Sequence, residues 1–242
     1  MTTTSLIRAL DLRAANGNPA RLWLRDDDAI APTTALDHLL ALTGAANIPV
    51  TLAVIPAHSG PALAKRLNTA KAVSVAVHGW SHTNHAPASE KKQELGPHRP
   101  TPQILDELAR GFSQLAQLHP AQFAPVLVPP WNRIAPEIVT ELPALGFKAL
   151  SVYGPVATVD LPLYNTHVDV IDWRGSRTGR PDAVLMDEIA QAMQRSDAPI
   201  GLLTHHLVHD AQVWGFLTRL FALTTNHPGC RWVSLPELVA SP

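Results

Sequence analysis

The chain has 242 residues, a formal net charge of −1, and 46% hydrophobic residues against 16% charged residues. This composition suits a chain with a large buried core and excludes an intrinsically disordered protein. The 19 basic and 20 acidic residues nearly cancel, so the chain lacks the overall basic charge typical of proteins that bind nucleic acid or anionic membranes. The single cysteine, Cys230, excludes an intramolecular disulfide.

The chain carries no targeting or membrane signal that we can identify. Its N-terminus lacks the apolar core of a secretory signal, and no apolar run approaches the roughly 20 residues of a membrane span. We therefore expect a soluble, cytoplasmic protein that binds neither nucleic acid nor membrane. The length suggests one large domain or two small ones, and a single α/β barrel domain over residues 1–242 lies within that range. The sequence leaves the oligomeric state open.

Short apolar runs alternate with helical stretches along the chain, a pattern typical of βα units around a parallel sheet. Strands are expected at residues 21–25, 50–55, 72–77, 126–128, 148–152, 168–171, 200–204 and 232–235. Helices are expected at residues 34–45, 61–67, 101–118, 136–145, 181–194 and 210–223, with Thr34 and Thr101 as N-caps. Residues 79–100 are expected to form a long polar loop, and loops of this length are usually functional or mobile.

Several polar side chains fall at, or just after, the carboxyl ends of the expected strands. They are Asp26, Asp27, His78, Asn132, Asp172 and His205. In a parallel α/β barrel these strand ends share one face, where active sites are built. Polar loops also follow strands in proteins without such a site, so the residue types have to decide between the two interpretations. Asp and His, which bind metals and carry protons, favour an active site.

Two histidines four residues apart, His78 and His82, would share a face of one helical turn and can bind one ion. With Asp27 they make a possible His₂Asp set, and three protein ligands with an open position are typical of a catalytic zinc site. In a chain with 12 histidines this spacing also arises by chance. The run from Asp26 to Asp28 is either a solvated turn or a site in which one carboxylate binds metal and its neighbour acts as a base. Of His205 and His206, alternation along an extended segment turns only one toward the site.

Five segments occur in an order that points to one family. They are Leu24–Asp28, His78–His82, Val128–Asn132, Asp169–Trp173 and Leu202–His205. The sequence resembles the polysaccharide deacetylase superfamily (NodB homology, carbohydrate esterase family 4), whose five motifs match these segments in the same order. The resemblance covers residues 24 to 206.

The resemblance implies an α/β fold, a distorted (β/α) barrel of about seven parallel strands that binds one divalent metal ion, with zinc as the default. It implies that Asp27, His78 and His82 hold the metal, that Asp26 is the general base, and that His205, or alternatively His206, is the general acid. The implied reaction is hydrolysis of an amide, most simply deacetylation of an N-acetylated sugar or oligosaccharide by metal-activated water. Residues implied or considered for substrate binding and support are Trp80, Asn84, His85, Pro130, Trp131, Asn132, Asp172 and Trp173.

Four departures from the family pattern are visible. In the first motif Arg25 stands in place of phenylalanine and Asp28 in place of glycine, and in the second motif Gly79 stands in place of Ser or Thr. The arginine that opens the third motif is missing, and Arg25 or Arg133 is the candidate substitute. Three alternatives therefore stay open: a hydrolase of a non-sugar amide or imide, an inactive carbohydrate-binding relative, and a structural barrel without metal.

Overall fold

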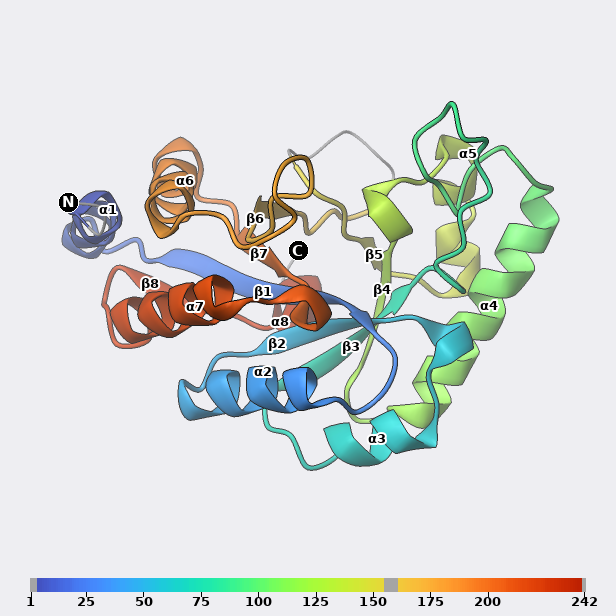
Figure 1. Cartoon of the computed structure of the whole chain (residues 1–242), viewed down its shortest axis with the longest axis horizontal. Helices are drawn as coiled ribbons and strands as arrows, with labels where there is room; N and C mark the ends of the chain where they lie inside the picture. Colours follow the sequence, from blue (N-terminus) through green and yellow to red (C-terminus); the bar gives the residue numbers. More distant parts are fainter. Residues whose placement is uncertain (1–3, 155–160, 241–242) are drawn as a thin grey trace.

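The computed structural model describes residues 4–154 and 161–240, which fold around one curled parallel sheet (Figure 1). Seven strands run in the order β5-β4-β3-β2-β1-β7-β6, and β8 pairs with β1. Parallel bridges between Leu150 and Leu163 and between Tyr153 and Thr166 link the two ends of this order. The strands are β1 (Ala20–Ala29), β2 (Val50–Val54), β3 (Val73–His78), β4 (Phe123–Val128), β5 (Ala149–Leu150), β6 (Thr166–Asp169), β7 (Ile200–Thr204) and β8 (Cys230–Trp232). The predicted distorted barrel is thereby confirmed.

Helices surround this sheet and connect its strands (Figure 1). They are α1 (Thr4–Ala15), α2 (Thr34–Ala45), α3 (Pro61–Leu67), α4 (Thr101–Leu118), α5 (Pro136–Val139), α6 (Asp182–Arg195), α7 (Ala211–Thr224) and α8 (Leu235–Ala240). Short 3₁₀ turns are η1 (Pro56–His58), η2 (Pro130–Asn132), η3 (Leu142–Leu145) and η4 (His206–Val208). Helices α2, α3 and α4 have the predicted bounds, because apolar spacing marks the buried face of each. A proline also marks the first turn of α3 and of α4.

The structure corrects several expected elements. The helices α1 and α8 were not predicted, and the helix expected over residues 136–145 divides into α5 and η3. Thr33, not Thr34, is the N-cap of α2, because its extended backbone lets Oγ1 accept the Leu36 N–H at 3.0 Å. Pro100, not Thr101, is the N-cap residue of α4, and it makes no side-chain capping hydrogen bond.

The core consists of two apolar clusters, one between the sheet and the helices and one inside the barrel. Successive side chains of β1 belong to these two clusters in turn. Leu22 and Leu24 belong to the large apolar cluster that the helices share with the sheet. Trp23 belongs to a smaller cluster inside the barrel, which combines mostly short side chains of β2 to β5 with Val233, Leu235 and Leu238. Because side chains alternate along a strand, Arg25 and Asp27 continue the inner row of Trp23, and Asp26 continues the outer row of Leu24.

Candidate active site

A cavity of about 930 Å³ lies at the carboxyl ends of the strands. Of the residues predicted for the site, those that line it are Asp27, His78, His82, Trp131, Asn132, Asp172, Trp173 and His205. The cavity lining does not include the other predicted residues, Asp26, Trp80, Asn84, His85, Pro130 and His206. Asp28, which the resemblance aligned with a glycine, does line it.

Asp28, His78 and His82 form the group that can hold a metal ion, with ligand atoms all within 4.8 Å of one another. Asp28 Oδ1 lies 3.2 Å from His78 Nε2 and 3.4 Å from His82 Nε2. His78 Nδ1 donates to the Val128 carbonyl at 2.8 Å, which orients its Nε2 toward the group, as in second-shell contacts of metal sites. Two imidazoles and one carboxylate suit zinc or a neighbouring divalent transition metal.

Asp28 thus occupies the position predicted for Asp27. Burial alone would raise the pKa of Asp28, but the hydrogen bond and charge of His78, together with His82, hold it well below its usual value. Burial alone would lower the pKa of His78, but the carboxylates of Asp27 and Asp28 outweigh it and raise that pKa. The group therefore concentrates negative charge beside imidazole nitrogen, the environment that a cation requires.

Asp27 is instead paired with Arg25 inside the barrel. Arg25 is fully buried, with its Nε 2.9 Å from Asp27 Oδ1 and its Nη2 3.1 Å from Asp27 Oδ2. Arg25 Nη2 also donates to Asn132 Oδ1 at 2.8 Å, and Nη1 donates to Ser151 Oγ at 2.7 Å. Of the two arginines considered as substitutes for the missing third-motif arginine, Arg25 is the one that contacts a carboxylate of β1.

Asp26 lies on the other face of β1, away from the cavity. Its Oδ2 accepts from Thr204 Oγ1 at 2.7 Å and from the His206 N–H at 2.9 Å, and Oδ1 contacts His206 Nδ1. Burial alone would raise the pKa of Asp26, but the charge and hydrogen bond of His206 lower it. Asp26 and His206 form a closed, buried pair, so neither predicted catalytic residue reaches the cavity.

The sequence leaves the register of the first motif ambiguous because three aspartates are consecutive. The parallel pairing of β1 with β2 shifts register between Asp26 and Ala29. Asp28 has a left-handed backbone with φ 71°, which breaks the alternation and turns its carboxylate to the metal-binding group. Asp and Asn adopt this conformation more readily than most residues.

His205 is the histidine of the fifth motif that lines the cavity. Its ring meets the Trp173 ring edge-on, with centroids 4.8 Å apart. Trp173 Nε1 donates to Asp169 Oδ2 at 2.9 Å. Trp173 therefore contacts both the Asp169 carboxylate and the His205 ring. Burial raises the pKa of Asp169, and the charge of His205 offsets part of that rise. Asp169 opens the fourth motif, but the resemblance implied the supporting role for Asp172.

Asp172 lines the cavity but supports its own loop. Its two carboxylate oxygens accept the backbone N–H groups of Gly175 at 3.0 Å and Ser176 at 3.2 Å. These backbone hydrogen bonds, chiefly that from Ser176, lower the pKa of Asp172. Asp172 therefore fixes the loop after β6, and among the described residues it makes no ion pair.

The second motif is a turn and not the helical turn considered from its spacing. His78 ends β3, and Gly79 and His82 have φ values of 59° and 57°. This turn brings the second imidazole back to the first, with ring centroids 5.1 Å apart. The buried Glu94 closes it by accepting from the N–H groups of Trp80 and Ser81 at 3.2 and 2.8 Å. Glu94, at the far end of the long loop, is thus a positioning residue for the site.

The third motif also has strained backbone. Trp131 and Asn132 have φ values of 55° and 56°, and a positive φ is unusual for a bulky residue. The conformation sets the Trp131 ring against His82, with centroids 4.3 Å apart, and directs Asn132 to Arg25. Pro130 is buried and does not line the cavity.

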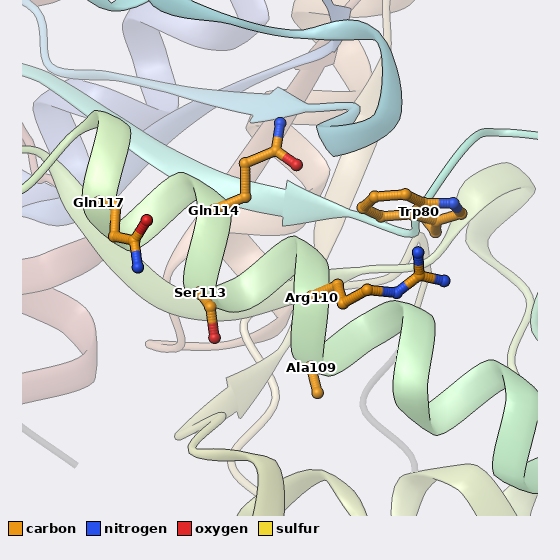
Figure 2. Close-up of a pocket in the computed structure, with 6 residues that line it drawn as sticks. All are labelled: Trp80, Ala109, Arg110, Ser113, Gln114 and Gln117. Atoms are coloured by element: carbon orange, nitrogen blue, oxygen red, sulfur yellow. The ribbon is translucent and has the colours of Figure 1, made fainter.

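The remaining predicted substrate residues lie elsewhere. Trp80 lines a separate surface hollow of about 490 Å³ on α4, where the Arg110 guanidinium lies 4.8 Å from its ring centroid (Figure 2). The Asn84 side chain forms hydrogen bonds within its own loop: its Oδ1 accepts from the Ala86 N–H at 3.1 Å and from the Gln93 N–H at 2.9 Å. His85 is exposed outside the cavity.

No family model and no curated protein matches the sequence significantly. Solved structures do match. The family 4 carbohydrate esterase from Streptomyces lividans in complex with acetate has a TM-score of 0.61 at 16% identity, over 90% of this chain and 94% of that chain. The family 4 acetyl xylan esterase from Clostridium thermocellum in complex with a cobalt ion has 0.59 at 16%, over 91% and 90%. A family 4 pseudoenzyme from Bacillus anthracis has 0.63 at 15%, over 92% and 66%.

The chain therefore has the fold of the polysaccharide deacetylases of carbohydrate esterase family 4. Among the helices of the described residues, none combines the length and apolar character needed to cross a membrane.

Proposed function

We propose that the protein is a metal-dependent hydrolase that removes the acetyl group from an N-acetylated sugar or oligosaccharide. One observation carries this proposal. The ligand atoms of Asp28, His78 and His82 lie within 4.8 Å of one another, in a cavity that Asp27 and His205 also line. A cation site, a carboxylate and an imidazole on one cavity are the groups that amide hydrolysis needs. The similar structures act in support, since one is named as an esterase with acetate and another holds a cobalt ion.

In this proposal Asp28, His78 and His82 hold one divalent ion, and Asp28 replaces Asp27 in the set expected from the sequence. The ion, when bound, supplies a Lewis acid for the amide carbonyl and a water of lowered pKa. His78 is held by Val128 and Asp28 by its left-handed backbone. The three side chains are therefore preorganised for a cation.

Asp27 is the proposed general base, in place of Asp26. It lines the cavity next to Asp28, whereas Asp26 does not line the cavity and contacts His206. Asp27 takes the proton of the attacking water, and Arg25 holds the carboxylate in one orientation through its two contacts. Arg25 thus supplies the role of the arginine absent from the third motif.

His205 is the proposed general acid. An amine leaves poorly unless it is protonated, so the departing nitrogen requires a proton donor. His205 lies on the cavity and packs against Trp173, while His206 is closed off by Asp26. Asp169, joined to the Trp173 indole, holds that ring beside His205.

Metal analysis of four proteins tests the assignment: wild type, Asp26→Asn, Asp27→Asn and Asp28→Asn. We expect about one equivalent of zinc or a similar ion in the wild type and in Asp27→Asn, and loss of the ion in Asp28→Asn. Asp26→Asn is the matched control within the same run of aspartates. Loss of metal in Asp27→Asn with retention in Asp28→Asn would overturn the ligand set.

Amine release from N-acetylated sugars and from small amides and imides then separates the remaining functions. The proposal expects release from an N-acetylated sugar that Asp27→Asn abolishes. Release only from a non-sugar amide would replace the substrate class. Metal binding without any release would identify an inactive relative, which the similarity to a pseudoenzyme makes worth testing. Metal-free wild type after reconstitution would overturn the hydrolase itself.

A further inference from the structure

The acidic and basic side chains that line the cavity differ in how many of them have partners within the protein. The acidic members are Asp27, Asp28, Asp169, Asp172 and Glu188. The basic members are Lys92, Arg133, Arg174, Arg177 and Arg180. The acidic and basic members are equal in number, so the contacts of each side chain decide which charged groups remain available to a ligand.

Every acidic member has a partner within the protein. The carboxylates of β1 and β6 have the contacts described above, and Asp172 is satisfied by backbone N–H groups of its loop. Glu188 pairs with Arg180, whose Nη1 lies 3.0 Å from Glu188 Oε2. One basic member, Arg180, is thereby neutralised as well.

The other four basic members are unpaired. Within residues 4–154 and 161–240, no carboxylate forms an ion pair with Lys92, Arg133, Arg174 or Arg177. Arg133 Nη1 donates to the Lys92 carbonyl at 2.9 Å, and Lys92 Nζ lies 5.9 Å from the Trp131 ring centroid. Neither contact neutralises a cation, so these four cationic side chains of the described lining are available to bind an anionic group of a ligand.

Arg174 and Arg177 belong to a loop that is held in place. The Arg177 N–H donates to the Asp172 carbonyl at 2.9 Å, and the Asp172 N–H donates to the Thr178 carbonyl at 3.0 Å. The Gly179 N–H donates to Asp210 Oδ2 at 2.9 Å, which ties the loop to the start of α7. Arg177 itself has a strained φ of 58°. The backbone that carries the two arginines is thus held at both ends, while their side chains are exposed on the cavity.

We propose that the substrate carries an anionic group, a phosphate or a carboxylate, which Arg174 and Arg177 bind at the rim while the scissile amide lies at the metal-binding group. This inference rests on the proposed function and names its substrate class. Guanidinium groups bind both anions through charge-assisted hydrogen bonds.

The test compares three substrates: N-acetylglucosamine, N-acetylglucosamine 6-phosphate and N-acetylmuramic acid, which carry no anion, a phosphate and a carboxylate. It uses the metal-loaded wild type and an Arg174→Gln/Arg177→Gln variant. Arg195→Gln is the matched control, since Arg195 ends α6 and does not line the cavity. Higher kcat/KM with the phosphate or the carboxylate substrate identifies which anion the rim prefers.

We expect kcat/KM for an anionic substrate to exceed that for the neutral sugar at least tenfold in the wild type. The double variant should lower that ratio at least tenfold, mainly through KM, and Arg195→Gln should leave it unchanged. The inference is overturned if the neutral sugar is hydrolysed as well as both anionic ones and the double variant leaves the ratio of their kcat/KM values unchanged. The proposed function would still stand in that case.

If no substrate is hydrolysed, the proposed function fails and binding still decides the inference. Calorimetry then measures N-acetylglucosamine 6-phosphate against N-acetylglucosamine with the same proteins. Tighter binding of the phosphate that weakens at least tenfold in the double variant supports the inference. Equal binding of the two sugars, or equal binding to wild type and double variant, overturns it.

Discussion

Replacing Arg25 by methionine tests whether the buried guanidinium holds the proposed base. Arg25 is fully buried and contacts Asp27 through Nε at 2.9 Å and Nη2 at 3.1 Å. Methionine has a similar stem but no charge, so Asp27 would stay in the barrel without its partner. Removing one member of a buried ion pair costs about 3–5 kcal/mol. For a chain of this size we expect the melting temperature to fall by roughly 10 °C.

The free energy of unfolding is measured by chemical denaturation of metal-free protein, so that changes in metal affinity do not enter. A double-mutant cycle with Asp27→Leu isolates the pair. The double variant, with apolar groups in both places, should be more stable than Arg25→Met alone, because no uncompensated charge is left buried. A loss under about 1 kcal/mol in Arg25→Met, or a double variant that loses the sum of both single losses, would refute the reasoning.

Three further predictions follow from particular contacts. Gly79→Ala should lose about 2–4 kcal/mol of stability, because a Cβ at this φ of 59° would lie 2.1 Å from Glu94 Oε2; an unchanged denaturation midpoint would contradict it. His209 Nε2 accepts the His205 N–H at 3.2 Å, and burial lowers the pKa of His209 to about 4. The unfolded chain therefore binds this proton first, and stability falls as pH drops from about 6.5 toward 4. His209→Gln, which keeps an acceptor, should lose less stability in that window, and equal acid sensitivity would count against this assignment. His205→Asn should abolish amine release at nearly unchanged stability, whereas His206→Asn should cost about 1–3 kcal/mol by leaving Asp26 short of a partner; the reverse pattern in activity and denaturation assays would exchange the two roles.

The pH effect of His206 has the opposite sign from that of His209. Burial alone would lower the pKa of His206, but the Asp26 carboxylate outweighs it and raises that pKa. Its contribution to stability is complete below the unfolded value of about 6.5 and is lost as pH rises through the folded value. The two histidines therefore change the stability in different pH windows. Below pH 6.5, the difference in stability between wild type and His209→Gln reports on His209.

The barrel could be predicted because its signals are local. Apolar runs of strand length alternate with helices, and helix α4 shows its bounds through its apolar spacing and the proline at its start. The strand-end rule also placed His78, Asn132 and His205 together, and all three line one cavity. Parallel strand order supplies that convergence without any knowledge of side-chain packing.

Which carboxylate joins His78 and His82 in the candidate metal site could not be predicted in the same way. Alternation along β1 separates Asp26 from Asp27, but the sequence does not say which face is inside the barrel. The left-handed backbone of Asp28 and the register shift beside it then break the alternation itself. The pairing of Arg25 with Asp27 does follow alternation, since residues two apart share a face.

The left-handed backbone of Asp28 also limits how this position can mutate. Glycine and asparagine accept a φ of 71° with little strain, while most other side chains do not. The replacements that the fold tolerates best are therefore ones that remove the carboxylate, and the proposed metal site with it. Under the proposed function, a single substitution at this position would remove catalysis and keep the cavity intact, so that selection could then retain the barrel for binding alone.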